Sequence, residues 1–388
     1  MIALLELKTK IIAPYLAATS KAKNAHCYVT TTPSGKAHLF VLDYFNSKVV
    51  KSYLKIDLGT FEQADIPVEK GNDFSFELDH IVTDKFPTSK IVMSHINDKV
   101  PQVAIDGSLA QEELGCVPFD ERYKFMFSAT PSFASNEVAR AKLCHLGLSL
   151  PKDGNIFSVV TDGHMAATCK LNVPQRLSED NNCFYFNASA TKFINRPSTS
   201  WLDIVYLKDE KNVTWAEVQG FSLIGGRVYD ITIGIQDQDV VESLGSPPNI
   251  LQVIPEYNSN CEPIPASVLL EAMSPKKLSE LFGFAIKSLK DVVICFSNEG
   301  DKLVVNFETA GVGETIISEK MVTPVQVLSD GVASKFAVEY LKTVLSESYD
   351  SLEPMLILNP ASTGPSVIKY GEPAVDDDIV GLVMGRRL

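Results

Sequence analysis

The sequence lacks several motifs that would assign it directly to a class of enzyme or metalloprotein. Its seven cysteines are scattered, and no C-x-x-C pair occurs among them. This usage is typical of reduced thiols and argues against a disulfide framework or a zinc site. No G-x-x-x-x-G-K-[ST] sequence is present to cradle a phosphate. The six histidines show no metal-ligand spacing, so we expect neither a metal ion nor a cofactor.

Long apolar runs are also missing. No run approaches the ~18 residues that a membrane-spanning helix requires. The first six residues are too short and too acidic for a secretory signal peptide. Together with the pattern of free thiols, these features lead us to expect a cytoplasmic protein.

Positive charge is in deficit, because the formal net charge is −13 and the isoelectric point is about 5.0. This balance argues against a simple basic coat for nucleic acid. Residues 252–388 carry only 11 basic against 19 acidic side chains, yet several of the basic ones lie on predicted helices. Such segregation indicates a local basic strip, which would bind phosphates without reading sequence and with a strong salt dependence.

A chain of 388 residues is long enough for two to three domains. A helical segment followed by hairpins recurs three times, which indicates one architectural unit used repeatedly. We predict an α+β fold with domains at 1–121, 122–251 and 252–388. Because an enzyme concentrates its chemistry in one place, three similar units favour a ring or a scaffold.

The elements of each round can be placed by periodicity and by turn residues. We expect helices at 7–19, 78–86, 135–146 (capped by Ser135 and ended by Gly147), 189–195, 268–273, 278–289 (after an interruption at Pro275) and 334–345. We expect strands at 27–31, 38–44, 48–58, 90–95, 102–105, 124–128, 155–160, 184–186, 201–207, 213–219, 228–235, 291–296, 303–308, 314–318, 355–359, 366–370 and 379–384. In the last helix, Phe336, Tyr340, Leu341, Val344 and Leu345 form the predicted core face, with Lys335 and Lys342 opposite.

A β-hairpin is predicted at residues 161–169, with Asp162-Gly163 at its turn. The turn places His164 beside Asp162, and this pair could serve as the acid–base unit of a hydrolase. No nucleophile elbow accompanies it, and Asp-x-His in a turn is more often turn chemistry than catalysis. The catalytic interpretation is therefore an alternative and not our main hypothesis.

Four segments carry a resemblance to a known family. They are 161–164 (Thr-Asp-Gly-His), 248–255 (Pro-Asn-Ile-Leu-Gln-Val-Ile-Pro), 336–341 (Phe-Ala-Val-Glu-Tyr-Leu) and 383–388 (Val-Met-Gly-Arg-Arg-Leu). In this order and spacing they resemble the bacterial DNA sliding clamp, the β subunit of DNA polymerase III. The first ~120 residues match only in pattern.

The resemblance implies three clamp-type domains per chain, with antiparallel sheets outside and paired helices inside, forming half of a closed ring. Two chains would join head to tail as a homodimer that encircles double-stranded DNA. The protein would then be a non-catalytic processivity factor whose partners are a replicative polymerase, a clamp loader and other clamp-motif proteins. The side chains expected to face DNA are Lys10, Lys21, Lys23, Arg140, Lys142, Lys192, Arg196, Lys335 and Lys342.

The resemblance also implies a pocket between the second and third domains that receives a short hydrophobic motif from partner proteins. The matching positions are Thr161, Gly163, His164, Met165, Ala166, Pro248, Val253, Leu382, Val383, Met384, Gly385, Arg386, Arg387 and Leu388.

The sequence departs from the family pattern at two places in this set. The family usually has Arg-Leu after the histidine, where this chain has Met165-Ala166. It usually ends in Met-Pro-Met-Arg-Leu, where this chain ends in Met-Gly-Arg-Arg-Leu. We expect a changed pocket shape, added charge and altered partner preference. Such divergence suits a phage-encoded or distant bacterial clamp. The alternatives are a hydrolase that uses Asp162 and His164, and a monomeric three-domain interaction scaffold.

Overall fold

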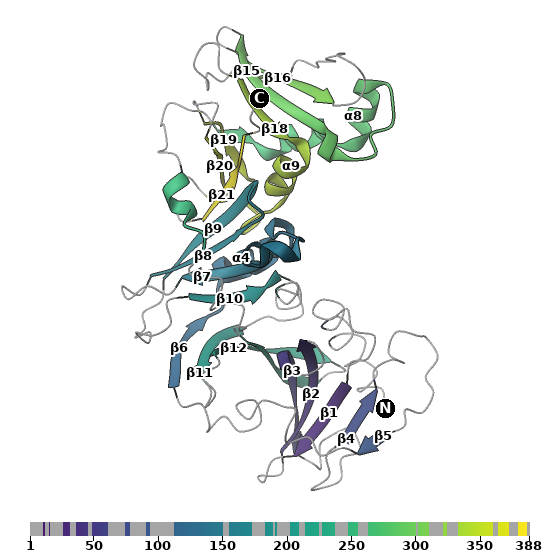
Figure 1. Cartoon of the computed structure of the whole chain (residues 1–388), viewed down its shortest axis with the longest axis vertical. Helices are drawn as coiled ribbons and strands as arrows, with labels where there is room; N and C mark the ends of the chain where they lie inside the picture. The colour runs from purple at the N-terminus through teal and green to yellow at the C-terminus, as the bar shows by residue number, and fades with distance from the viewer. Residues whose placement is uncertain are drawn as a thin grey trace. The chain divides into compact units, whose positions relative to one another are not determined.

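A computed structural model of the chain describes residues 11, 15, 26–31, 36–45, 49–60, 74–77, 91–93, 112–149, 155–172, 183–188, 191, 202–208, 214–224, 227–236, 247–254, 263–299, 302–309, 321–323, 333–359, 364–371 and 379–385 (Figure 1). The chain divides into two compact units. The first comprises Met1–Pro131, Ser149–Ile156 and Asn172–Gly245, and the second comprises Ser132–Leu148, Phe157–Leu171 and Ser246–Leu388. The α+β class with antiparallel sheets is confirmed. The three domain boundaries stay a prediction.

The first unit is built on one sheet with strand order β5-β4-β1-β2-β3-β13-β12-β11-β6. Its strands are β1 (His26–Thr31), β2 (Lys36–Phe45), β3 (Val49–Thr60), β4 (Phe74–Glu77), β5 (Ile91–Met93), β6 (Glu112–Pro118), β11 (Leu202–Lys208), β12 (Thr214–Ile224) and β13 (Arg227–Gln236). A further strand of this unit is β10 (Cys183–Asn187). Six expected strands of this unit are confirmed, namely those at 27–31, 38–44, 48–58, 201–207, 213–219 and 228–235. They could be predicted because alternating apolar residues identify a strand locally.

The segment 124–128, predicted as a strand, is instead part of helix α4 (Glu121–Phe133). The side chain of Asp120 accepts a hydrogen bond from the backbone N–H of Tyr123 at 3.1 Å, which satisfies an amide of the first helical turn. Tyr123 and Phe127 are buried one turn apart, and their rings both contact Phe119. The prediction was wrong because alternating aromatic residues favour a strand locally, whereas the cap and the buried face belong to a helix.

The second unit contains two sheets, with strand orders β7-β8-β9-β21-β20-β19-β14 and β17-β16-β15-β18. Its strands are β7 (His145–Ser149), β8 (Asn155–Thr161), β9 (Met165–Asn172), β14 (Ile264–Pro265), β15 (Val292–Glu299), β16 (Lys302–Thr309), β17 (Met321–Thr323), β18 (Ala333–Ala337), β19 (Met355–Ile357), β20 (Ser366–Lys369) and β21 (Ile379–Val383). Its helices are η3 (Val138–Cys144), η4 (Ile250–Val253), α7 (Ala266–Ala272), α8 (Pro275–Phe282), η5 (Leu289–Asp291) and α9 (Val338–Ser346).

Three predicted helices of this unit are shorter than expected. The helix at 278–289 ends at Phe282, because Gly283 stops α8. The helix at 135–146 is reduced to η3, a 3₁₀ helix in which Arg140 has non-helical angles (φ −107°, ψ 55°). Gly147 ends no helix, because it lies inside strand β7. The helix at 334–345 begins only at Val338, and residues 333–337 form β18, where Phe336 pairs with Ile294.

Proline and glycine set the limits of α8. Pro275 was expected to interrupt a helix, but it occupies the first turn of α8, where its missing N–H costs nothing. The Ser274 hydroxyl caps this turn by accepting a hydrogen bond from the backbone N–H of Lys277 at 3.3 Å. Gly283, at φ +72°, ends α8 in a left-handed conformation that favours glycine.

Helix α9 packs through one face onto the β20–β21 pair. Val338, Leu341, Val344 and Leu345 of α9 are all buried. The Tyr370 hydroxyl at the end of β20 donates a hydrogen bond to the backbone oxygen of Val344 at 2.8 Å. This close approach requires Gly381, since a Cβ there would lie 2.7 Å from the Tyr370 hydroxyl. The C-terminal strand is thereby held against the helix.

Some predicted elements lie wholly or largely outside the described residues. They are the helices at 7–19, 78–86 and 189–195 and the strands at 102–105 and 314–318. Within the described part of the chain, no helix combines the length and the apolar character that a membrane span requires.

Candidate functional site

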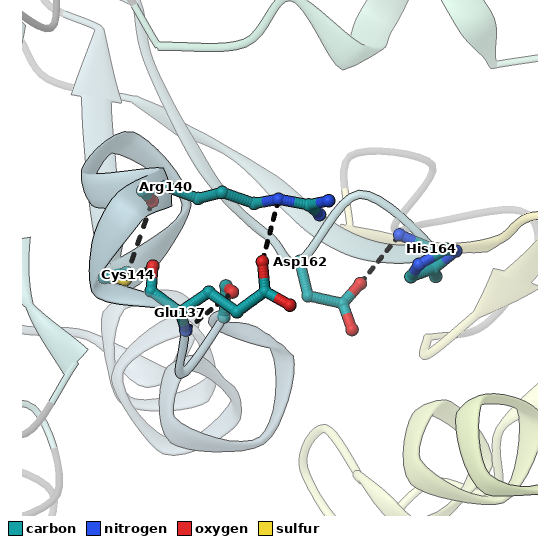
Figure 2. Close-up of polar contacts among 6 residues, drawn as sticks. Glu137, Arg140, Cys144, Asp162 and His164 are labelled. Carbon is teal, nitrogen blue, oxygen red and sulfur yellow. Dashed lines mark hydrogen bonds and ion pairs between the residues drawn. The ribbon is translucent and has the colours of Figure 1, made fainter. Parts of the chain in front are cut away.

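The predicted hairpin is confirmed, and its turn joins β8 to β9 (Figure 2). One carboxylate oxygen of Asp162 accepts hydrogen bonds from the backbone N–H groups of His164 (2.7 Å) and Met165 (2.9 Å). The Thr161 hydroxyl donates to the backbone oxygen of Met165 at 2.7 Å. Gly163 adopts φ +95°, which L-residues rarely tolerate. The local sequence therefore determines this turn through its own side chains.

The imidazole of His164 stacks on the phenol ring of Tyr340 in α9, with ring centroids 4.9 Å apart. His164 is exposed and Tyr340 is half-buried. Helical periodicity placed Tyr340 on the core face of its helix, so the sequence did not reveal it as a neighbour of the hairpin. No local signal in the sequence identified this contact, because it depends on how α9 packs against the hairpin.

The C-terminal strand runs beside the hairpin. In the pairing of β21 with β9, Leu382 lies opposite Ala166 and Val383 lies opposite Met165. The backbone N–H of Met384 donates to the backbone oxygen of His164 at 2.8 Å. The structure therefore brings together two segments that the sequence analysis assigned to one site.

The members of the predicted pocket differ in exposure. Thr161, Met165, Ala166, Leu382 and Val383 are buried. Gly163 and His164 are exposed, Pro248 and Gly385 are intermediate, and Val253 and Met384 are 48% and 41% exposed. Arg386, Arg387 and Leu388 lie outside the described residues. The buried members pack inside the unit, and among the described members the exposed apolar side chains are those of Val253, at the end of η4, and Met384.

A charged cluster from η3 lies beside the hairpin turn (Figure 2). The Arg140 side chain forms an ion pair with Glu137 at 3.0 Å and approaches within 3.9 Å of the position that a Cβ on Gly163 would take. Burial raises the pKa of the Tyr340 hydroxyl, and the negative charges of Asp162, Glu339 and Glu137 raise it further against the opposing effect of Arg140. The phenol therefore stays neutral and serves as a stacking surface.

Cys144 ends the same 3₁₀ helix and is tied into it. Its thiol donates weak hydrogen bonds to the backbone oxygens of Glu137 (3.3 Å) and Arg140 (3.6 Å). Burial and then the charge of Glu137 raise the pKa of this thiol above its usual value. A raised pKa lowers the thiolate fraction, which fits a structural cysteine and not a nucleophile.

The basic side chains predicted to face DNA are placed unevenly. Lys142 lies in η3 and Lys342 in α9, both partly exposed. Lys335 was expected on a helix, but it lies in strand β18 and forms an ion pair with Glu308 at 3.1 Å. This expectation was wrong because the helix begins three residues later. Lys10, Lys21, Lys23, Lys192 and Arg196 lie outside the described residues.

Four exposed lysines were missed by the sequence analysis. Lys276 and Lys277 lie on α8, Lys287 lies in the loop that follows, and Lys290 lies in η5. Lys290 also contacts Glu339 of α9 at 3.9 Å. The signal was present in the sequence, since four of the eleven basic residues after position 251 fall within this short stretch.

The geometry does not assemble an acid–base pair from Asp162 and His164. The Asp162 carboxylate bonds the backbone amide of His164, while the imidazole lies against Tyr340. General acid–base catalysis requires the side chains themselves to be within hydrogen-bond reach of the reacting proton. Among the described residues, no group of three or more His, Cys, Asp or Glu is arranged to hold a metal ion.

The antiparallel sheets of the two units and the short helices of the second are arranged as in solved bacterial DNA sliding clamps. The chain is similar to the beta clamp of Helicobacter pylori, with 12% identity, a TM-score of 0.65 and 98% of each chain covered. It is also similar to the polymerase III beta protein of Caulobacter crescentus (13% identity, TM-score 0.60, 100% of this chain and 98% of that chain).

A third solved structure with the same fold is the sliding clamp of Pseudomonas aeruginosa, DNA polymerase III subunit beta, bound to griselimycin. It shares 14% identity with a TM-score of 0.58, over 100% of this chain and 97% of that chain. No protein-family model matches the sequence, and no curated protein matches it. The chain therefore has the sliding-clamp fold in a divergent form.

Proposed function

We propose that this protein is a DNA sliding clamp, a non-catalytic ring that encircles duplex DNA without sequence specificity and tethers a replicative polymerase. The observation that supports this proposal is the likeness to bacterial clamps over at least 97% of both chains. A likeness over the whole length matters because a ring needs every one of its domains to close. A fold alone does not determine function, and the hairpin site is a second observation that supports the proposal.

In this proposal two chains join head to tail as a homodimer, and a clamp loader opens the ring. Phosphates would be contacted by helix-borne lysines, namely Lys142, Lys342 and the exposed group on α8, its following loop and η5. Contacts to phosphates alone impose no preferred register, which allows sliding. Lys335 is left out, because Glu308 neutralises its charge at 3.1 Å in a largely covered pair. Lys277 and Lys290 are kept, because they are exposed and their acidic partners, Glu271 and Glu339, lie farther away, at 3.8 and 3.9 Å.

Partner proteins would dock a short apolar motif beside the hairpin turn and the C-terminal strand. Met384, whose backbone bonds His164 of the turn, offers exposed apolar surface there, and Val253 at the end of η4 is a second exposed apolar side chain of the predicted pocket. His164, stacked on Tyr340, offers a rigid flat edge. Since Met165 is buried where the family usually has arginine, its effect on partner choice would come through the shape of the wall and not through charge.

The ring proposal is tested by retention on DNA. Protein loaded onto circular DNA by a bacterial clamp loader should remain bound, and it should dissociate once the circle is cut. Equal retention on circular and linear DNA would contradict encirclement. In the absence of DNA, the solution mass at micromolar concentration should be twice the 42.5 kDa of one chain. A monomer would instead support the three-domain scaffold.

The docking site can be tested separately with griselimycin as the probe. We expect the wild-type chain to bind it and Val253→Asp to weaken binding at least tenfold, because a charge would replace exposed apolar surface. Val228→Asp is a matched control, since Val228 is 58% exposed and lies on β13 of the first unit. No binding by the wild type, or equal losses in the two variants, would contradict the assignment.

A further inference from the structure

The nine-stranded sheet of the first unit has a short junction between β3 and β13. These strands pair only from Ser52 to Ile56, opposite Ile235 to Ile231. The ladders on either side are longer, since β2 pairs with β3 along all of Lys36–Phe45 and β12 pairs with β13 from Trp215 to Ile224. A shorter ladder provides fewer backbone hydrogen bonds, so a side-chain hydrogen bond across it is a larger share of what holds the two strands together.

One tyrosine crosses the junction. Tyr53 of β3 lies opposite Gly234 of β13, which lies opposite Glu217 of β12. The Tyr53 ring occupies the space above Gly234, because a Cβ there would lie 2.0 Å from two ring atoms. The Tyr53 hydroxyl donates a hydrogen bond to a carboxyl oxygen of Glu217, which is 164 positions away in the sequence. A side chain of β3 therefore reaches past β13 and bonds β12.

The pair is buried, because Tyr53 has no exposed surface and Glu217 is 9% exposed. Burial raises the pKa of Glu217, and the hydrogen bond from Tyr53, the charge of Lys55 and a hydrogen bond from Gln219 each act against this rise. Burial, followed by the negative charge of Glu217, raises the pKa of the Tyr53 hydroxyl well above its usual value. The phenol therefore keeps its proton, and the carboxyl is the member that titrates.

Other polar groups near the pair do not change which of its two members titrates. The Tyr15 hydroxyl bonds the Ser52 hydroxyl at 2.8 Å and raises the pKa of Tyr53 slightly. Farther along β2 and β3, His38 lies 3.8 Å from Asp57. Among the groups that act on Glu217, Lys55 supplies the positive charge, and it only partly offsets burial.

We propose that the Tyr53–Glu217 couple is a proton-dependent fastener of the β3–β13 junction. With a proton on Glu217, the neutral carboxyl accepts the Tyr53 hydrogen bond inside the sheet and the junction is closed. When that proton leaves to solvent, a carboxylate forms in a buried site and favours local opening, which would hydrate it. The inference concerns the first unit alone and does not depend on the clamp proposal.

The direction of the pH effect follows from linkage. The folded junction binds the Glu217 proton more tightly than the opened one, so closure is most favourable below the ordinary glutamate pKa of about 4.3. It weakens as pH rises through the higher pKa of the closed state. Each unit by which burial raises this pKa corresponds to about a tenfold increase in the opening constant at high pH.

Hydrogen exchange of the full-length chain between pH 5 and pH 9 provides the test. Protection factors, corrected for the intrinsic exchange rate, should fall at least tenfold with rising pH at Ser52–Ile56 and at 231–235. Strand β11 (Leu202–Lys208), in the same sheet, should change less. In Glu217→Gln the amide oxygen still accepts the hydrogen bond but carries no charge, so protection at the junction should not vary with pH relative to β11.

A second variant separates a proton-linked role from packing alone. Tyr53→Phe removes a bond that stabilises the carboxylate, so its loss of protection at the junction should grow with pH. Tyr15→Phe is the matched control, because it removes the hydrogen bond between the Tyr15 and Ser52 hydroxyls. Any loss of protection at the junction in this variant should be independent of pH. The proposal is overturned if wild type and Glu217→Gln show the same pH dependence, or if β11 loses protection together with the junction.

Discussion

The imidazole of His164 and the phenol ring of Tyr340 lie face to face, with centroids 4.9 Å apart and planes 13° apart. This contact connects the hairpin turn between β8 and β9 to the first turns of α9. The backbone of His164 meanwhile accepts a hydrogen bond from Met384. One residue thus joins three segments that are far apart in the sequence, and the stacked ring gives the histidine side chain a structural role.

Replacement of Tyr340 by alanine should release the imidazole. The ring current of Tyr340 shifts the His164 ring-proton resonances, and in Tyr340→Ala we expect these signals to move towards random-coil positions. The stability cost should be about 0.5–1.5 kcal/mol for the lost aromatic pair, in addition to burial. Tyr340→Phe is the control, since it keeps the stacking face. Unchanged histidine resonances in Tyr340→Ala would show that the rings do not stack in solution.

Asp162 should contribute to stability and not to turnover. Asp162→Ala removes an acceptor for two backbone amides of the turn, so we expect a loss of about 1–3 kcal/mol in the free energy of unfolding, measured with denaturant. Asp162→Asn retains a side-chain oxygen and should lose less. His164→Ala should leave assays with phosphate and acyl esters at background. Hydrolysis by the wild type that disappears in His164→Ala would revive the hydrolase alternative.

Two lysines predicted from the sequence to share a role should now behave differently. Lys342→Ala removes a helix-borne charge, so the slope of log affinity for DNA against log salt concentration should fall by about 1. Lys335→Ala removes a charge that Glu308 already neutralises, and it should leave this slope unchanged. Equal changes in the two variants would mean that the strand position of Lys335 does not separate it from the DNA-contacting set.

Stability should also depend on pH through Glu347, at the end of α9. Burial raises the pKa of Glu347, against a smaller lowering by a hydrogen bond from Ser132. Since the folded-state pKa lies above the unfolded value of about 4.3, the folded protein should lose stability as pH rises through the higher value. Glu347→Gln should therefore gain stability relative to the wild type between pH 5 and pH 8.

Denaturant midpoints at several pH values measure this difference directly. The other carboxylates also make stability depend on pH, so each variant is compared with the wild type at the same pH. Glu280→Gln is the control: Glu280 is exposed, and the variant should follow the wild-type curve at every pH. A constant difference between Glu347→Gln and the wild type across this range would contradict a raised pKa.

Much of the fold could be predicted because the pattern of neighbouring residues is enough to identify most strands. Alternation of apolar residues located β1, β2, β3, β12 and β13, and Asp-Gly located the turn at residues 162–163. The same reasoning gave wrong predictions at two places. At α4, alternating aromatic residues have the pattern of a strand, and at β18 the first residues of a predicted helix pair with β15. Local propensity was overridden there by capping and by strand pairing.

The sequence by itself determined the class of fold, the hairpin and its turn, the scattered thiols and the acidic balance. Each of these depends on neighbouring residues or on composition alone. Only the tertiary structure decided that Tyr340 meets His164, that Glu308 neutralises Lys335 and that Tyr53 reaches Glu217 across Gly234. Such contacts depend on the register between strands and on which helix covers them, and a one-residue shift in register would reverse the face of every side chain.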